Sequence, residues 1–313
     1  MNKIGIDVGG TSIKMGIVNE QNQIIADSSI PTQTGIPFPE QVEQMVACVN
    51  GLLRDTGLTA DQIASVGAGI PGLADENGRV VLCTNLGWKD VPLRDEFQKR
   101  LNKPFYVDND ANVAALAESV IGVSAGTSSS VFITLGTGIG SGIIFNGQIV
   151  RGHHGIGGEL GHMILELDGI PCSCGNHGCL EQYCSATAMI RMARQLVAVH
   201  PESLILKLAD SDPMKIHAKT IFDALREGDE IAQKVFRKYV IYLSQAITNI
   251  VNLMDPEMII LGGGVSRAGS ILLDAVREEY PKYVLFKNLP LTRVELASLG
   301  SEAGIIGAAM LTR

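Results

Sequence analysis

Two glycine-rich turns, each placed between apolar runs, constrain the fold of this chain more than any other feature. The first turn, at residues 9–11, separates apolar residues 3–8 from apolar residues 13–18. The second, at 136–140, stands in the same way between 129–135 and 141–145. Each run has the length and apolar character of a buried strand. Two such hairpins far apart in the chain predict a duplicated α/β fold, in which each of two lobes contributes one hairpin.

Glycine turns of this kind can place backbone N–H groups against phosphate oxygens. A carboxylate at the end of the first strand can hold Mg²⁺ through water, and the hydroxyl and ammonium groups that follow can meet phosphate. The alternative is an ordinary hairpin in which glycine supplies a positive φ, but the recurrence of the pattern favours a nucleotide between the two turns. The candidate nucleotide-binding residues of the turns are Asp7, Gly9, Gly10, Thr11, Lys14, Gly136, Thr137 and Gly138.

Length and charge limit the classes of protein that the chain can belong to. The 313 residues suffice for two lobes with a sizeable core, and the net charge of −8 argues against nucleic acid as a partner. The first apolar run begins at residue 3, and neither a signal peptide nor a membrane-spanning apolar stretch is apparent. We therefore expect a cytoplasmic protein without a membrane partner.

Between the two hairpins, residues 39–56 have helical spacing and residues 63–70 read as a strand. Gly69, near the end of that strand, would let backbone approach a ligand closely. The polar loop at 84–88 contains Asn85 and the only tryptophan, Trp88. This loop is either part of a ligand pocket or a surface turn.

Three polar residues, Asp108, Asn109 and Asp110, join an expected strand at 102–107 to an expected helix at 111–120. An aspartate or asparagine before a helix is most often an N-cap. A carboxylate at such a junction can also face a cleft and act as a general base. The sequence alone leaves both interpretations open.

Further elements are expected after residue 180. Helices are predicted from Ser185 to about His200, from Thr220, over 229–253 and over 302–311, with strands at 257–261 and 294–297. Gly262, Gly263 and Gly264 stand between a strand and a helix, which suits close approach to a nucleotide, although helix–sheet packing also favours glycine. We expect the last helix to return to the first lobe, so that residues 1–110 with 299–313 form a small lobe and 111–298 a large one.

The segment 157–181 holds three cysteines in the pattern C-x-C-x4-C, at Cys172, Cys174 and Cys179. Three thiols so close together in a chain of this size indicate zinc rather than a disulfide or buried thiols. Tetrahedral zinc needs a fourth ligand, for which His162, His177 and Cys184 are the candidates.

The motifs G-E-L-G-H and C-S-C-G-N-H-G-C-L-E, together with D-V-G-G-T and L-G-T-G-I-G-S-G, resemble the signature of the ROK family of bacterial sugar kinases and repressors. The resemblance covers residue 4 to the C-terminus and is strongest to the ROK glucokinases. It implies an actin-like (ribonuclease H-like) ATPase fold and an ATP-dependent hexose kinase that makes glucose 6-phosphate. It also implies a homodimer that uses ATP and Mg²⁺.

The resemblance assigns roles to particular residues. It implies a structural zinc held by His162, Cys172, Cys174 and Cys179, and Asp110 as the general base, with Asp108 or Asn109 left as the helix cap. Gly262, Gly263 and Gly264 are expected near the adenosine. The expected sugar-binding residues are Gly69, Asn85, Asn109, Asp110, Glu159, His162 and Glu181.

The resemblance also leaves alternatives. The hexose is open among glucose, N-acetylmannosamine, fructose, mannose and allose, and the donor between ATP and polyphosphate. A ROK-type repressor would be expected to carry a DNA-binding segment before the first strand, for which no room is apparent, and a non-catalytic sensor would be expected to lack Asp110.

Overall fold

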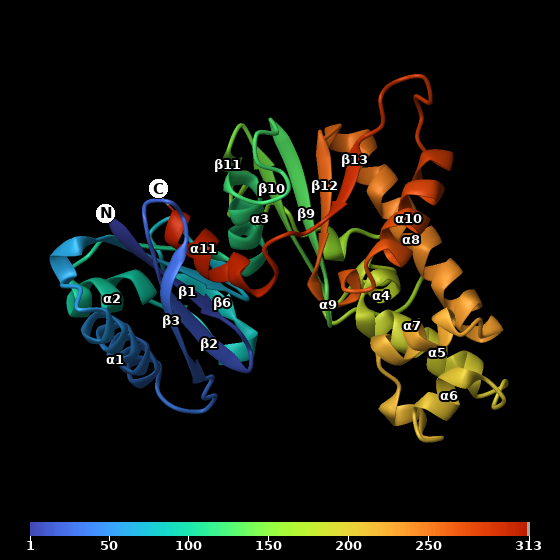
Figure 1. Ribbon diagram of the computed structural model, residues 1–313, viewed down its shortest axis with the longest axis horizontal. Helices are drawn as coiled ribbons and strands as arrows, with labels where there is room; N and C mark the ends of the chain where they lie inside the picture. The colour runs from blue at the N-terminus through green and yellow to red at the C-terminus, as the bar shows by residue number, and fades with distance from the viewer. Residues whose placement is uncertain (312–313) are drawn as a thin grey trace. The chain divides into compact units, whose positions relative to one another are not determined.

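The computed structural model describes residues 1–311 and divides into two compact units (Figure 1). Unit 1 comprises Met1–Ser128, Gly142–Gly158 and the chain from Ser298 onward, and unit 2 comprises Ser129–Ser141 and Glu159–Ala297. The lobes expected at 1–110 with 299–313 and at 111–298 remain a prediction, and Thr312 and Arg313 lie outside the described residues.

A five-stranded sheet with the order β3-β2-β1-β4-β8 forms the centre of unit 1. Its middle strand β1 pairs antiparallel with β2 and parallel with β4, as the apolar runs on either side of the first turn predict. Ile4, Ile6 and Val8 join the core that α1 covers. The strands are β1 (Asn2–Val8), β2 (Ser12–Val18), β3 (Ile24–Pro31), β4 (Ile63–Ile70) and β8 (Phe105–Asn109), and α1 is Phe38–Thr56.

The C-terminal helix α11 (Ala303–Met310) lies against the other face of this sheet, as Figure 1 shows. A Cβ atom on Gly5 would lie 1.8 Å from the carbonyl oxygen of Ile305, and one on Gly67 would lie 1.8 Å from that of Ala308. Helix and strands therefore touch backbone to backbone, which only glycine permits. The same approach places Gly304 of α11 against the carboxylate of Asp7.

The second sheet has the order β11-β10-β9-β12-β13. Its middle strand β9 pairs parallel with β12, which pairs parallel with β13. Both sheets thus place the first strand of a hairpin in the middle, and this confirms the duplicated α/β arrangement predicted from the two turns. The strands are β9 (Ser129–Leu135), β10 (Ile139–Phe145), β11 (Gln148–Ile149), β12 (Met258–Gly262) and β13 (Arg293–Leu296), so that β10 begins two residues before the expected position.

Most of unit 2 outside the sheet is helical. Ser185 caps α5 by accepting from the Ala188 N–H, and Asp229 caps α8 by accepting from the Ala232 N–H, so both predicted starts are confirmed. The helix expected from Thr220 begins two residues earlier, because His217 takes the N-cap position. The helices are α4 (Glu181–Cys184), α5 (Ala186–Val197), α6 (Leu204–Leu208), α7 (Ala218–Arg226), α8 (Glu230–Met254), α9 (Gly263–Ser266) and α10 (Ser270–Glu279).

The prediction of a polar loop at 84–88 is wrong in one respect, because Trp88 belongs to the core. It begins β7, is 2% exposed and packs edge-on against Phe38 at 5.3 Å. Its indole N–H donates to Gln41 at 2.7 Å, which satisfies the one polar atom that burial would otherwise leave unpaired. Unit 1 is completed by β5 (Leu73–Ala74), β6 (Val80–Cys83), β7 (Trp88–Val91), α2 (Leu93–Leu101) and α3 (Asp110–Val120).

No helix within residues 1–311 combines the length and the apolar character needed to cross a membrane.

Candidate active site

The first glycine turn is braced from within unit 1. The Gly9 N–H donates to Ser12 O at 3.0 Å, and the Thr32 hydroxyl donates to Gly9 O at 2.7 Å. Gly10 and Thr11 at the tip are exposed, and their N–H groups have no partner among residues 1–311. Two adjacent N–H groups in this state can donate to an anion such as phosphate.

Two charged side chains flank this turn. Asp7 and Lys14 face each other across the β1–β2 pair. Burial raises the pKa of Asp7, and Lys14 acts in the opposite direction. Burial disfavours the charged form of this carboxylate, and a nearby cation would stabilise it, so Asp7 suits the expected role of holding Mg²⁺.

The second glycine turn has the same design within unit 2. The Gly136 N–H donates to Gly138 O at 3.0 Å and the Gly140 N–H to the Thr134 hydroxyl at 3.0 Å. The N–H groups of Thr137 and Gly138 are left without a partner in the described part of the chain. Each unit therefore presents one pair of adjacent N–H groups.

The third glycine segment follows β12. A Cβ on Gly262 would lie 2.6 Å from the Phe132 ring, and one on Gly263, whose φ is +84°, would lie 2.7 Å from Leu135 N. Packing alone thus requires glycine at both positions. A Cβ on Gly264 would meet no atom within 4 Å, so Gly264 is the one of the three that borders open space.

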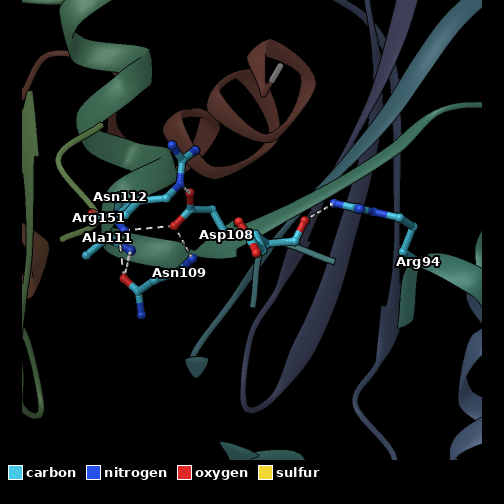
Figure 2. Close-up of polar contacts among 7 residues, drawn as sticks. Arg94, Asp108, Asn109, Ala111, Asn112 and Arg151 are labelled. Atoms are coloured by element: carbon cyan, nitrogen blue, oxygen red, sulfur yellow. Dashed lines mark hydrogen bonds and ion pairs between the residues drawn. The ribbon is translucent and has the colours of Figure 1, made fainter. Parts of the chain in front are cut away.

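The junction of β8 and α3 separates the two roles that the sequence left open (Figure 2). Asn109 is the N-cap, because its side-chain oxygen accepts from the N–H groups of Ala111 and Asn112. Asp110 is the first residue of the helix, and one of its oxygens accepts from the Ala111 N–H at 2.9 Å. The cap expected at Asp108 or Asn109 is therefore Asn109, and Asp110 is not needed for capping.

Asp108 has a function that the sequence did not indicate. Its buried carboxylate accepts from the Asn112 amide at 2.8 Å and from the Asn109 N–H at 2.8 Å, and it pairs with Arg151 at 2.5 Å (Figure 2). These bonds hold the backbone of Asn109, before Asp110, and the side chain of Asn112, after it. No local signal marks this pair, since Arg151 lies 43 residues further along the chain.

The remaining sugar-binding candidates of unit 1 surround the same junction. A Cβ on Gly69 would lie 3.1 Å from the Val113 side chain and 3.5 Å from the Asp110 Cα, so this glycine permits close packing of β4 and α3. Burial, with a smaller contribution from the charge of Asp110, raises the pKa of the Cys83 thiol to about 11, against hydrogen bonds from the backbone of Leu86 and Asn85. The exposed Asn85 and the half-buried Asp110 are therefore both close enough to Cys83 to influence its pKa.

Four residues of unit 2 form a Cys/His cluster, defined as His162, Cys172, Cys174 and Cys179. Their ligand atoms all lie within 4.8 Å of one another, with Cys172 Sγ 3.7 Å from His162 Nδ1 and Cys174 Sγ 3.6 Å from Cys179 Sγ. Tetrahedral zinc, with bonds of about 2.3 Å to sulfur and about 2.0 Å to nitrogen, requires ligand atoms at this separation. The donor set and its spacing fit zinc.

The backbone that carries the cluster is held by glycine. Gly175 and Gly178 have φ of +94° and +75°, and a Cβ on Gly178 would lie 1.7 Å from the carbonyl oxygen of Glu166. The rival ligands are placed elsewhere: His177 is exposed. Cys184 is fully buried in α4, where its carbonyl accepts from the Tyr239 hydroxyl at 2.7 Å. Neither belongs to the group of four.

The thiols of the cluster influence one another. Burial favours the neutral form of Cys172, but hydrogen bonds from Cys174, His162 and Cys179 outweigh it and lower the pKa to about 6. Burial, reinforced by hydrogen bonds with Cys174 and Cys172, raises the pKa of Cys179 to about 12. A metal ion binds thiolates, so it would displace the proton that Cys179 otherwise keeps.

Glu159 and Glu181 flank this cluster in sequence. Glu159 directly precedes the turn Leu160–His162, and Glu181 is the first residue of α4, two positions after Cys179. One oxygen of Glu181 accepts from the Ile139 N–H at 2.9 Å, at the end of the second glycine turn.

Comparison with known proteins identifies the family. A profile of the ROK family matches residues 3–313, and the chain belongs to this family. It is 38% identical over 312 residues to the glucokinase of Thermotoga maritima, covering 99% of this chain and 96% of the relative. It is 36% identical over 312 residues to the glucokinase of Halalkalibacterium halodurans, covering 99% and 94%.

A solved structure gives the same result. The crystal structure of a ROK family glucokinase from Streptomyces griseus in complex with glucose and AMPPNP matches with a TM-score of 0.84 and 35% identity, over 100% of this chain and 99% of that one. ROK sugar kinases have the actin-like ATPase fold, so the predicted family and fold class are both confirmed.

Proposed function

We propose that this chain is an ATP-dependent hexose kinase, specifically a glucokinase that forms glucose 6-phosphate. The observation that carries the proposal is its similarity, over nearly its whole length, to glucokinases, among them one solved with glucose and an ATP analogue. The two glycine turns, each with a free pair of N–H groups, supply the phosphate-binding elements that such a reaction needs.

Asp110 is proposed as the general base. Phosphoryl transfer depends on positioning and on neutralisation of charge more than on covalent chemistry. A carboxylate near the attacking hydroxyl takes its proton as the oxygen approaches the γ-phosphate. Asp110 suits this role because Asn109 is the N-cap of α3, and because the Asp108 carboxylate, paired with Arg151, holds the Asn109 N–H beside it.

The nucleotide is proposed to use both turns. Gly9, Gly10, Thr11 and Lys14 in unit 1 would meet phosphate, with Asp7 holding Mg²⁺ through water, and Gly136, Thr137 and Gly138 would meet phosphate in unit 2. Gly262, Gly263 and Gly264 are proposed to lie near the adenosine. Of these three, Gly264 has the open surroundings that contact with a ligand requires.

The sugar is proposed to be bound by Gly69, Asn85, Asn109 and Asp110 of unit 1 and by Glu159, His162 and Glu181 of unit 2. The Cys/His cluster would hold a structural zinc. Four protein ligands fill a tetrahedral shell and leave no open position, so the metal would shape the segment that carries Glu159, His162 and Glu181. A homodimer, a cytoplasmic location and the absence of a nucleic-acid partner remain predictions from the sequence.

The test of the function is a sugar panel with ATP and coupled detection of ADP. We expect the highest kcat/KM for glucose, about ten- to a hundredfold above that for mannose, because a half-buried carboxylate such as Glu181 left without its hydroxyl partner costs about 1–3 kcal/mol. If fructose, allose or N-acetylmannosamine gives the highest kcat/KM, the chain is a kinase for that sugar, and turnover with none of them refutes the kinase.

The test of the base is Asp110→Asn. It should fold normally and lower kcat by about 10²–10⁴-fold, the usual contribution of a general base. The matched control is Asp95→Asn, an exposed acid in the first turn of α2, which should leave kcat unchanged. Near-normal turnover by Asp110→Asn would refute the catalytic assignment.

A further inference from the structure

The second glycine turn is held by a short segment that follows the Cys/His cluster. The Glu181 carboxylate accepts from the Ile139 N–H at 2.9 Å. The Ala186 N–H donates to Gly136 O at 2.8 Å, and the Thr187 hydroxyl donates to Thr137 O at 2.7 Å. We call these three residues the turn brace; all of them, like the turn itself, belong to unit 2.

The brace determines which groups of the turn remain available. Three N–H groups of the turn donate to partners within unit 2, namely those of Gly136, Ile139 and Gly140. The adjacent N–H groups of Thr137 and Gly138 are the ones left without a partner in the described chain. Because the carbonyls of Gly136 and Thr137 are bound to the brace, neither peptide can rotate to withdraw its neighbour's N–H from this position.

Glu181 approaches the turn so closely that a larger residue at position 138 would have to displace its carboxylate. A Cβ on Gly138 would lie 2.3 Å from Glu181 Oε2. Thr187 is exposed and also lines an open cavity of about 610 Å³ together with Ile190 and Arg191.

The first turn is supported differently. Thr32, on the chain just after β3, supplies its bonds through a hydroxyl and a backbone N–H. In the second turn the Ala186 N–H and the Thr187 hydroxyl donate to carbonyls in the same way, and the Glu181 carboxylate, two residues after Cys179 of the cluster, adds an acceptor for the Ile139 N–H. The cluster and the turn are thus connected through Glu181.

We infer that Glu181 and Thr187 are positioning residues of the nucleotide turn, and that Glu181 serves the turn in addition to the sugar. This inference rests on the function proposed above. One carboxylate is then shared by the sugar-binding segment and the phosphate-binding turn. Loss of the brace weakens nucleotide binding even when no sugar is present.

The experiment is calorimetric titration of the full-length protein with Mg²⁺-ADP in the absence of sugar. Thr187→Val removes one brace bond and touches no proposed sugar residue, so we expect ADP affinity to fall about three- to tenfold with an unchanged KM for glucose. Glu181→Ala should lower ADP affinity about tenfold and also raise the KM for glucose. Glu181→Gln keeps an acceptor oxygen, so its ADP affinity should stay within about threefold of wild type.

Two controls separate the brace from general damage. Glu159→Ala alters a proposed sugar residue that no hydrogen bond of the described chain joins to the turn, so sugar-free ADP affinity should be unchanged. Thr220→Val makes the same chemical change as Thr187→Val at the start of α7 and should leave ADP affinity unchanged. Amide hydrogen exchange should be faster at Ile139 in Glu181→Ala and unaltered in Glu159→Ala.

The results discriminate between the possible failures. If wild-type protein does not bind Mg²⁺-ADP, the proposed kinase function itself is wrong. If it binds, and Thr187→Val binds as tightly, the brace is refuted whether or not Glu181→Ala folds. If Thr187→Val binds ADP more weakly but Glu181→Ala binds it normally while its KM for glucose rises, Glu181 serves the sugar alone. The part of the inference that concerns Glu181 is then refuted.

Discussion

Glu118 makes the most demanding set of hydrogen bonds in unit 1, and its replacement by glutamine gives a sharp test of the structure. The side chain is fully buried in α3. One carboxylate oxygen accepts from the N–H groups of Ser298 and Leu299 at 2.7 and 2.9 Å, and the other accepts from the Ser298 hydroxyl and the Val123 N–H at 2.8 and 2.9 Å. Four donors thus converge on one carboxylate at the point where the chain enters its last helix.

The expected loss in the free energy of unfolding follows from the number of donors that lose their acceptor. In Glu118→Gln one oxygen becomes an NH₂ group, which can accept nothing. The best arrangement keeps both N–H groups of Ser298 and Leu299 on the remaining oxygen and lets the Ser298 hydroxyl turn and accept. The Val123 N–H is then unpaired, which costs about 1–3 kcal/mol, and the bonds to a neutral acceptor are weaker than those to a charged one. We expect a total loss of about 2–4 kcal/mol.

The assay is thermal unfolding, in which about 2–4 °C is lost per kcal/mol in chains of this size class. Glu118→Gln should lower the Tm of unit 1 by about 4–16 °C. The control is Glu279→Gln, whose carboxylate also accepts two hydrogen bonds, from Lys282 and Tyr283, but on the surface of α10. It should change stability by at most about 1 kcal/mol. Equal Tm values for the two variants would refute the four-donor arrangement.

Three further predictions concern the cluster, the first turn and the C-terminal helix. Cys174→Ser should lower the zinc content below one ion per chain and lower the Tm, whereas Cys48→Ser, outside the cluster, should keep the zinc content of wild type. Metal analysis of protein purified without chelator measures this. A wild-type protein without zinc would contradict the site. Asp7→Asn should raise Tm at pH 7.5 in metal-free buffer, and the gain should vanish toward pH 4. Burial raises the pKa of Asp7 above its unfolded value, so ionisation penalises the folded state only at pH values above that unfolded pKa; a variant less stable than wild type at pH 7.5 would contradict this sign. Gly67→Ala places a Cβ 1.8 Å from Ala308 O and should cost about 3 kcal/mol or more, whereas Gly51→Ala, inside α1 with its nearest neighbour at 3.9 Å, should stabilise by about 0.5–1 kcal/mol. Chemical denaturation measures both, and tolerance of Gly67→Ala would contradict the backbone contact of α11 with the sheet.

Elements with a strong local signal could be predicted from the sequence. β1, β4 and β9 are apolar runs bounded by glycine, and α8 has a capping aspartate and sustained helical spacing. The strand β3 carries no such signal, because its residues alternate between half-buried and exposed positions. The sheet of β5, β6 and β7 was also missed, since strands of two to four residues are too short for a periodic pattern.

The residues of the candidate site also fall into those with a local sequence signal and those without one. Residues within one motif, such as Cys172, Cys174 and Cys179, could be named because their spacing itself carries the chemistry, whereas His162 was implied only by the family resemblance. Pairs formed across the chain could not, because nothing local marks their partners: Asp108 meets Arg151 over 43 residues, and Glu118 meets Ser298 over 180. Side chains that position the site are therefore harder to predict than the side chains that bind or react.

The duplicated turns explain why these positioning residues matter. Each turn has the same kind of group, a pair of adjacent backbone N–H groups without a partner among residues 1–311, and these are chemically identical in both units. If both turns bind phosphate as proposed, we expect a difference between their phosphate affinities to come from the side chains that support them. The first turn has Asp7 and Lys14 beside it and Thr32 as its support, whereas the second has the carboxylate of Glu181 and the hydroxyl of Thr187. Glu181 lies two residues after Cys179, so the second turn is hydrogen-bonded to the segment that carries the Cys/His cluster, whereas the first turn is supported by Thr32 of unit 1.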